Sequence, residues 1–356
     1  MTDQGRSVPA PGLRVLLLDS NDAAAVARWE AYVAAAPGAT FFHRAPWQKI
    51  LREVFRHRTF FLHAERDGAI EGILPLAQIN SRLFGNALVA LPFAVYGGIV
   101  ARTAEVATAL EAEAEKIARQ LDVAHLEYRN IDARHPDWPR QDLYVTFRKE
   151  ILPEEEANML AIPRKQRAMV RKSIGNGLRS EIDPDASRFF ALYADNVRRH
   201  GTPALPKRYF DALLNEFGND CDVLTVVDAE GTPVSSVVNF YFRDEILPYY
   251  AGDAVRAREL AANDFKYWEL MRRSCARGLK VFDYGRSKVG SGSYSFKKNW
   301  GFVPRPLNYE YRLYKRDAIP QNNPNNPKYH LMIAAWRRLP LWVVNRLGPL
   351  IVRNLG

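Results

Sequence analysis

The stretch "FDYGRSKVGSGSYSFKKNWGF", residues 282–302, carries the pattern that decides the fold. It begins as a strand, passes through a glycine-rich turn, and continues as a helix with the adjacent lysines Lys297 and Lys298. The turn contains Gly285, Gly290 and Gly292 together with two cations. A loop of this composition can cradle a phosphate, hold a substrate over a lysine, or only turn the chain.

The elements that lead into this stretch occur twice in the chain. Each half reads as a helix opened by proline, a hairpin, a strand with proline and aromatic residues, a long helix and a second strand. These are expected at 206–218, 222–242, 247–253, 258–278 and 280–287 in the second half, and at 46–56, 60–79, 91–98, 104–121 and 123–130 in the first. The interval from Pro92 to Tyr128 equals that from Pro248 to Tyr284, so we expect these segments to superpose.

This order predicts an α/β fold of two tandem domains, each a mixed, largely antiparallel sheet flanked by helices. The alternative is a chance similarity between the halves. Two equivalent units can form a cleft between them, with the junction near 151–158. Only the second half has the glycine loop and the lysine-bearing helix, so we expect the chemistry there and a scaffold or substrate wall in the first half.

Positive charge gathers in two zones of a chain whose net charge is +10. The segment 163–180 and the segment 327–356 both contain several lysines and arginines and no acidic residue. Such zones suit polyanionic partners, namely phosphorylated substrates, RNA or an anionic membrane face. A solvated basic surface is the alternative for each zone.

Several features predict a cytoplasmic protein. The two cysteines, Cys221 and Cys275, form no metal-like spacing and indicate a reducing compartment. The apolar segment "LRVLLLD" near the N-terminus is too short for a signal peptide. No run approaches the roughly 20 apolar residues that a spanning helix requires.

Common catalytic motifs are missing. Gly285 and Gly290 have the spacing of a P-loop, but Ser291 stands where lysine should follow. The dinucleotide fingerprint, the H-E-x-x-H pattern and the G-x-S-x-G elbow do not occur. We therefore expect no metal ion, and what remains is group transfer by positioning.

Four residues are candidates for the chemistry itself. Lys297, early in its helix, can stabilise negative charge on a carbonyl oxygen, while Lys298 on another helix face should point to solvent. We expect Lys297 to face the cleft between the halves. Asp283 ends a strand and can act as a base or orient one, and Tyr249 and Tyr250 end the neighbouring strand and can position a substrate. Structural roles are open for each: packing for the tyrosines, a turn cap for Asp283, solvation for the lysines.

The loop that follows Asp283 is the candidate site for a substrate or its phosphate. A turn around glycines presents backbone amides to an anion, and nearby cations can meet the same anion. The residues assigned to this role are Arg286, Ser287, Lys288, Gly290 and Gly292.

These residues resemble the FemAB-like branch of the GNAT acyltransferase fold. The likeness lies in the strand F-D-x-G, the glycine-rich loop, and F-K followed by an aromatic residue and glycine in 282–302. Together with "PRKQRAMVRKS" and "RRHGTPALPKRYF", the pattern is similar to FemAB-related proteins associated with exosortase/PEP-CTERM exopolysaccharide systems. The resemblance covers roughly residues 40–315, and the tandem repeat agrees with it.

The resemblance implies acyl or aminoacyl transfer to an amine of a cell-envelope or exopolysaccharide intermediate, with the lysine of F-K corresponding to Lys297. The donor stays open between acyl-CoA and aminoacyl-tRNA. The long coiled-coil arm of some classical members is absent. The R/Q-x-x-G-x-G/A motif that binds the diphosphate of CoA is missing from "GDAVRARELAAND". The alternative is a non-catalytic, degenerate acyltransferase that binds a polyanionic glycan or scaffolds envelope assembly.

The expected division of the chain is a first GNAT-like domain over 12–150, a second, FemAB-type acyltransferase domain over 159–316, and a basic amphipathic tail over 327–356. The tail has several apolar residues, two tryptophans and arginines at seven- to nine-residue steps, interrupted by Pro340 and Pro349. It can pack on the protein's own body, or it can attach the protein peripherally to an anionic inner-membrane face.

Overall fold

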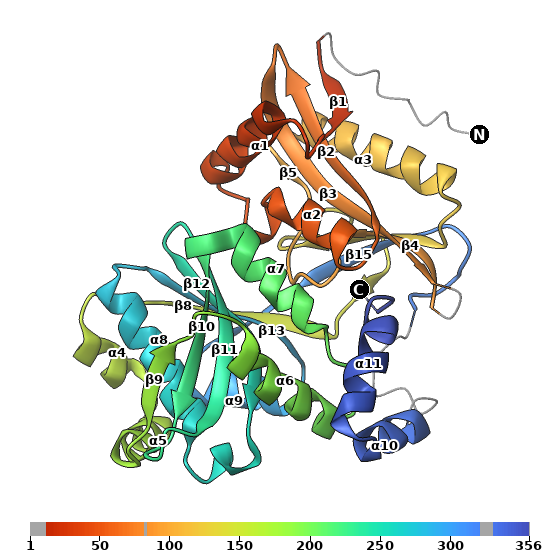
Figure 1. Ribbon diagram of the computed structural model, residues 1–356. Helices are drawn as coiled ribbons and strands as arrows, with labels where there is room; N and C mark the ends of the chain where they lie inside the picture. Colours follow the sequence, from red (N-terminus) through yellow and green to blue (C-terminus); the bar gives the residue numbers. More distant parts are fainter. Residues whose placement is uncertain (1–11, 82–83, 321–329, 356) are drawn as a thin grey trace. The chain divides into compact units, whose positions relative to one another are not determined.

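The structure is a computed structural model that describes residues 12–81, 84–320 and 330–355 (Figure 1). Backbone contacts divide the chain into two compact units. The first unit contains the described residues up to Gln141 together with Asn308–Ile319, and the second contains Asp142–Leu307 and the described residues from Pro320 to Leu355. Each unit is built around one sheet.

The first unit has a sheet in the order β1-β2-β3-β4-β6-β15-β7, with β5 beside β3. Only β4 and β6 pair in parallel. Asp67 and Gly68 both have positive φ, which gives the tight turn between β2 and β3 that the sequence predicts. The strands are β1 (Arg14–Leu17), β2 (Arg58–Arg66), β3 (Ala69–Ser81), β4 (Gly85–Ala90), β5 (Val100–Ala101), β6 (His125–Asn130), β7 (Arg140–Gln141) and β15 (Asn308–Leu313).

Helices cover both faces of this sheet. The long helix α3 (Ala104–Gln120) packs its apolar stripe, including Val106 and Leu110, against leucines of β2, β3 and β4 (Figure 1). The other helices are α1 (Ala23–Ala35), η1 (Phe41–His43) and α2 (Pro46–Glu53). Their aromatic residues are buried, and Trp29, which stacks on Phe61, is fully so.

The second unit has a sheet in the order β9-β10-β11-β12-β13-β8-β14. Again one pair is parallel, β12 with β13. The strands are β8 (Tyr144–Glu150), β9 (Arg179–Ile182), β10 (Cys221–Val227), β11 (Pro233–Phe242), β12 (Glu245–Asp253), β13 (Val281–Lys288) and β14 (Pro304–Pro306).

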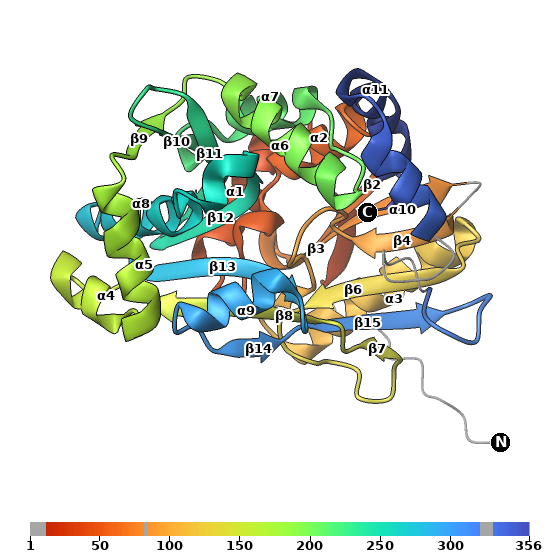
Figure 2. The same ribbon diagram turned by 90° about the horizontal axis from the view of Figure 1, so that it is seen from below.

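One core of the second unit lies between this sheet and α5, α8 and α9, and an aromatic cluster on α6 and α7 packs against β12. Figure 2 shows α9 beside β13. The helices are α4 (Glu155–Ala161), α5 (Arg164–Gly175), α6 (Ser187–His200), α7 (Lys207–Phe217), η2 (Gly218–Asp220), η3 (Val255–Arg258), α8 (Ala262–Ala276), α9 (Gly292–Asn299), α10 (His330–Arg338) and α11 (Leu341–Val352).

The predicted repeat is confirmed in the sheets, because position by position the two strand orders are the same. In each, a strand, a long helix and a second strand form the parallel pair, β4-α3-β6 and β12-α8-β13. The strand beside β13 is β8, which follows β6 in the chain, and the strand beside β6 is β15, which follows β13. Each half of the sequence thus supplies one strand to the other sheet. This division differs from the expected boundaries at 150 and 159, because 144–150 belongs to the second sheet and 308–313 to the first.

Three expectations within the repeat are wrong. The segment 91–98 is not a strand, because β4 ends at Ala90 and the chain then turns through Leu91 and Phe93 with positive φ. In the parallel pairs, Leu88 lies opposite Leu126, whereas Ile246 lies opposite Phe282. The two connections therefore differ by two residues, and the equal Pro–Tyr intervals are no structural equivalence. Helix α8 also begins later than expected, after the short helix η3.

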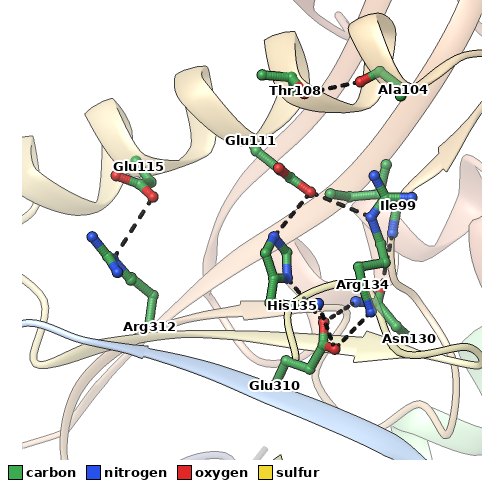
Figure 3. Close-up of polar contacts among 10 residues, drawn as sticks. All are labelled: Ile99, Ala104, Thr108, Glu111, Glu115, Asn130, Arg134, His135, Glu310 and Arg312. Carbon is green, nitrogen blue, oxygen red and sulfur yellow. Dashed lines mark hydrogen bonds and ion pairs between the residues drawn. The ribbon is translucent and has the colours of Figure 1, made fainter. Parts of the chain in front are cut away.

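A buried carboxylate fixes β15 in the first sheet (Figure 3). Glu310 is fully buried and accepts hydrogen bonds from the backbone amides of Arg134 and His135 and from Asn130 Nδ2. The His135 ring lies between Glu310, 3.0 Å from Nδ1, and Glu111, 3.3 Å from Nε2. These contacts join β15 to β6, to the loop after it and to α3.

Candidate functional site

The candidate site lies where β12 and β13 separate. The two strands share only two residue pairs, Glu245 with Val281 and Ile246 with Phe282. Each strand then has a bulge. In β12, Tyr249 is left over between the pairs formed by Pro248 and Tyr250, and in β13 Tyr284 is left over between Asp283 and Gly285. Bulges re-aim side chains and interrupt pairing, so beyond them the facing edges of these strands are not paired with each other.

Lys297 on α9 binds the main chain of β13 at this bulge. Its Nζ donates to the carbonyl oxygens of Tyr284 at 2.6 Å and of Gly285 and Arg286 at 3.2 Å each. The side chain is only 7% exposed, whereas Lys298 is exposed, as the helix spacing predicts. The three protons of an ammonium match the three carbonyl oxygens.

The surroundings of Lys297 lower its pKa. Burial lowers the pKa of Lys297 to about 7, an effect that the charge of Asp283 opposes and that of Arg286 reinforces. The rings of Phe147 and Tyr284 lie 5.6 and 5.5 Å from Nζ and favour its charged form. The amine can therefore gain or lose a proton near neutral pH.

Asp283, which directly precedes the bulge of β13, is fully buried. Its Oδ1 accepts a hydrogen bond from the amide of Gly285 at 2.7 Å, and its Oδ2 lies 3.4 Å from a guanidinium nitrogen of Arg148 on β8. Gly285 has φ +64°, a conformation that glycine adopts without strain. These contacts agree with an orienting role, in which Asp283 holds the bulge and influences Lys297 through its charge.

The two tyrosines of β12 lie against α6 and α7. The hydroxyl of Tyr250 is 2.9 Å from that of Tyr209, and its ring packs against Tyr193 and Phe210. Burial raises the pKa of Tyr250 well above its ordinary value. Tyr249 stacks edge-on against Tyr250 with ring centres 4.7 Å apart. The structure thus places this pair in an aromatic layer, and Lys297 on a helix that packs on β13.

The glycine loop joins β13 to α9. Gly290 has φ +76°, and the hydroxyl of Ser291 caps α9 by accepting from the amide of Tyr294. Arg286 and Gly292 are exposed and Lys288 is half-buried; the guanidinium of Arg286 lies 4.4 Å from the ring centre of Tyr144. Ser287 is buried, and its hydroxyl has no hydrogen-bond partner among the described residues.

The turn between β12 and α8 does not fit the diphosphate of CoA. Residues 254–261 contain no glycine, and their amides are largely used inside the turn: those of Ala257, Glu259, Leu260 and Ala261 donate to carbonyl oxygens of residues 254–258. The first turn of α8 also contains Asp264, whose carboxylate accepts from Gln166 and Trp300. An anion there would meet a turn without glycine and the carboxylate of Asp264.

Sequence reasoning missed Arg148 and Phe147. Both lie on β8, which the sequence assigns to the first half, and they reach the site only because β8 pairs with β13. No local signal shows which sheet this strand joins. Among the residues that the structure describes, no group of three or more His, Cys, Asp or Glu is placed to hold a metal ion.

Residues 164–298 match a family model described as an acetyltransferase (GNAT) domain. No curated protein sequence matches the chain at a significant level. Among solved structures, FemX covers 90% of this chain with all of its own, with a TM-score of 0.67 and 13% identity.

Two further solved structures share the architecture. L-PGS from Bacillus licheniformis has a TM-score of 0.56 and 14% identity, covering 90% of this chain and 97% of its own. A tandem GNAT protein from the clavulanic acid biosynthesis pathway has a TM-score of 0.53 and 14% identity, covering 85% and 98%. At these identities the likeness concerns the fold. The chain therefore has a tandem GNAT fold. The residues that match the GNAT model include β12 and β13, the two strands that separate at the site, and Lys297.

Proposed function

We propose that this protein transfers an acyl or aminoacyl group to an amine of a cell-envelope or exopolysaccharide intermediate. The observation that carries the proposal is the buried Lys297, whose ammonium lies at the bulge where β12 and β13 separate. The solved structures of similar fold include FemX and L-PGS. A parted pair of strands with a buried cation suits a reaction in which negative charge develops on a carbonyl oxygen.

The proposed step is direct attack of the acceptor amine on the activated carbonyl carbon. The new C–N bond forms, the carbonyl oxygen takes the electron pair, and the amine then loses a proton. Collapse of this intermediate restores the C=O bond and breaks the bond to the sulfur or oxygen of the donor's carrier, which leaves with the electron pair and takes up the proton that the amine lost. Lys297 stabilises the oxyanion by exchanging one of its two longer carbonyl contacts, at 3.2 Å, for the developing charge.

The neighbouring residues support this step. Asp283 orients the bulge and opposes the fall in the pKa of Lys297. Tyr249 and Tyr250 position the substrate by the aromatic wall that they form on β12. The phosphate-bearing part of a substrate binds at the end of β13 and in the loop after it, at Arg286, Ser287, Lys288, Gly290 and Gly292.

The donor in this proposal is acyl-CoA or aminoacyl-tRNA. A yeast N-myristoyltransferase with bound myristoyl-CoA shares the fold at a TM-score of 0.50 and 10% identity. The test is a transfer assay with labelled acyl-CoA and labelled aminoacyl-tRNA against amino-sugar and peptide amines. Native mass spectrometry of the purified protein identifies a carrier that stays bound. Failure of both donors with every acceptor contradicts the proposal.

A second candidate function is a non-catalytic module that binds a polyanionic glycan or scaffolds envelope assembly. One observation favours it: all three protons of the Lys297 ammonium are already matched by main-chain carbonyls. In that case replacing Lys297 lowers stability but leaves glycan binding intact. Binding of an anionic glycan without any transfer would identify the module.

We also propose that the C-terminal helices α10 and α11 attach the protein to an anionic membrane face. Their inner side packs on α6 and the turn after it: Val344 is buried, and Gly348 lies against the backbone of Ala204. The outer side of α11 shows Trp342, 72% exposed, Arg346, and Leu350, 61% exposed, which lie at four-residue steps along one line. On α10, Leu331 is 86% exposed. Exposed tryptophan, leucine and arginine without acids suit an anionic interface.

No helix in the described part of the chain is long and apolar enough to cross a membrane. We predict that the protein sediments with vesicles that contain phosphatidylglycerol. The double variant Trp342→Ala, Leu350→Ala should weaken this binding about tenfold, because two apolar anchors are lost. Leu160→Ala on α4, where the leucine is 54% exposed, is the matched control and should bind as wild type. A full-length protein that stays in the supernatant at low salt contradicts membrane attachment.

A further inference from the structure

Helix α5 and the first residue of β9 carry cations that no acid neutralises. None of them forms an ion pair or a side-chain hydrogen bond with a residue that the structure describes, whereas the arginines of α6 and α8 pair with Asp, Glu or backbone groups. The unpaired cations are Arg164, Lys165, Arg167, Arg171, Lys172 and Arg179.

Three of these arginines surround a hollow on the helix. A depression of about 430 Å³ is lined by Arg164, Arg167, Ala168 and Arg171. Steps of three and four residues place these positions on neighbouring rows of one side of α5. The small side chain of Ala168 leaves room between the three guanidinium groups. Guanidinium groups bind phosphate oxygens through paired hydrogen bonds.

The start of α5 adds to the same positive field. Pro163 precedes the helix, the first intrahelical bond runs from the amide of Arg167 to the carbonyl of Pro163, and no acidic residue lies in the first turn. The amides before Arg167 are therefore not used within the helix, and the helix dipole favours an anion at this end.

The like charges on α5 are costly to keep together. Arg164 and Arg167 are three residues apart, and Arg167 and Arg171 are four apart, spacings at which like charges destabilise a helix by roughly 0.2–0.5 kcal/mol per pair. The neighbouring surface of the same unit contains acids, such as Glu155, Glu156 and Glu259, that do not compensate them. A cluster that stays uncompensated is suited to an anion from outside.

Helix α5 lies directly against the start of α8. Gln166 donates a hydrogen bond to the carboxylate of Asp264 in the first turn of α8, and Asn176 Nδ2 donates to the carbonyl of Leu260 at 3.0 Å. Val170 is fully buried between the two helices. Residues 166 and 170 lie on the opposite side of α5 from the positions that line the hollow, so the hollow is on the side of α5 that faces away from α8. The turn before α8 contains no glycine, and the first turn of α8 carries the carboxylate of Asp264.

We propose that α5 binds the diphosphate group of a small nucleotide-linked donor or acceptor, through Arg164, Arg167, Arg171 and the free amides of its first turn. The turn before α8 does not bind this group. The site deepens the proposed transfer function, on which its assignment to donor or acceptor rests. The binding itself requires no reaction.

Calorimetric titration with inorganic pyrophosphate, CoA and a nucleotide diphosphate tests the site. We expect wild-type binding that weakens with salt, and at least a tenfold loss of affinity in the double variant Arg167→Gln, Arg171→Gln, because two charge-assisted contacts disappear. Neither side chain pairs with a residue that the structure describes, so the free energy of unfolding should change by no more than about 0.5 kcal/mol.

Arg258→Gln is the matched control. Arg258 is an exposed arginine in the turn before α8, and its loss should leave pyrophosphate binding unchanged. The proposal is overturned if no diphosphate binds at low salt, or if Arg258→Gln weakens binding while the α5 variant does not. Binding of a short RNA alone, with no small diphosphate, also overturns it. Arginine-dependent binding without any acyl transfer would retain the site and refute the proposed function.

Discussion

The two sheets have the same strand order, but they differ in what lies at the point where their parallel strands separate. In the first unit, the segment 91–98 leaves β4 and is fixed beside β6. Arg129 donates to the carbonyls of Leu91 and Ala94, and the hydroxyl of Tyr309 donates to the carbonyl of Val95. Arg129 is itself held by Glu127, 2.7 Å away. The chain's own backbone therefore occupies the separation.

In the second unit, β12 continues as a strand to Asp253, and among the residues that the structure describes no such segment binds β13 in the same way. The carbonyls of the β13 bulge are bound by the ammonium of Lys297 instead. A main-chain segment that is fixed by a buried ion pair stabilises the fold. A single amine with a pKa near 7 can exchange one hydrogen-bond acceptor for another. We propose a structural role for the first separation and a chemical role for the second.

The largest expected effect comes from removing the buried ion pair between Arg129 and Glu127 in the first unit. Arg129→Met leaves Glu127 as a buried, unpaired charge and removes the donor to two carbonyls. We expect the free energy of unfolding of this unit to fall by about 3–5 kcal/mol. Denaturant unfolding measures it. Arg119→Met, which removes an exposed pair with Glu115, should cost about 0.5 kcal/mol or less. Similar losses in both variants would show that the ion pair of Arg129 does not hold the segment 91–98 in place.

The corresponding change in the second unit should act on turnover. Lys297→Met removes the cation at the bulge, and we expect turnover to fall about 10²–10³-fold, the range for loss of one oxyanion donor. Lys298→Met, on the exposed side of α9, should keep wild-type turnover. Circular dichroism and thermal unfolding must show that both variants are folded. A folded Lys297→Met protein with full activity would remove this residue from the mechanism.

The pH dependence of turnover sharpens the same point. If the ammonium form stabilises the oxyanion, the rate should decline as pH rises through about 7, the pKa of Lys297. The charge of Asp283 raises that pKa, so Asp283→Asn should move the declining limb to lower pH. Steady-state rates between pH 5.5 and 9, at pH values where the variant stays folded, measure the shift. A limb that does not move argues against coupling between the two residues.

A smaller, pH-dependent effect on stability is expected near β15, the strand that the second half of the sequence contributes to the first sheet. Burial acts against the charge of His135, but hydrogen bonds and charges of Glu111 and Glu310 outweigh it and raise its pKa to about 9. Because the folded pKa is raised above 6.5, the stabilisation is complete below pH 6.5 and is lost as pH rises through 9.

His135→Gln should therefore lower the free energy of unfolding by about 3 kcal/mol at most at pH 6, and by much less at pH 9.5. Urea unfolding at both pH values measures the difference. His200→Gln, on an exposed side chain at the end of α6, is the control. An equal loss at both pH values would mean that His135 acts by packing, for example through its stack on Trp138, and not by charge.

The local pattern of the sequence predicted most of the elements. Proline at the start of α2 and before α7, the Asp67–Gly68 turn and the helix after the glycine loop were all readable from neighbours in sequence. The segment 91–98 was misread because proline and aromatic residues before glycine also occur in a strand, as they do in β12. The bonds from Arg129 and Tyr309 distinguish the two cases, and both come from residues distant in sequence.

The sequence by itself determined the tandem α/β architecture, the adjacency of Lys297 and the glycine loop, and the basic surface of α5, because periodicity, turn residues and charge are local properties. Tertiary structure alone decided which sheet receives β8 and β15, and with them the surroundings of Lys297 and Glu310. An alternating strand can pair with either sheet, since its pattern records which face is buried but not its neighbour. The pKa of Lys297 follows from that neighbour, because burial beside β13 and Phe147, not the identity of the residue, sets the cost of its charge.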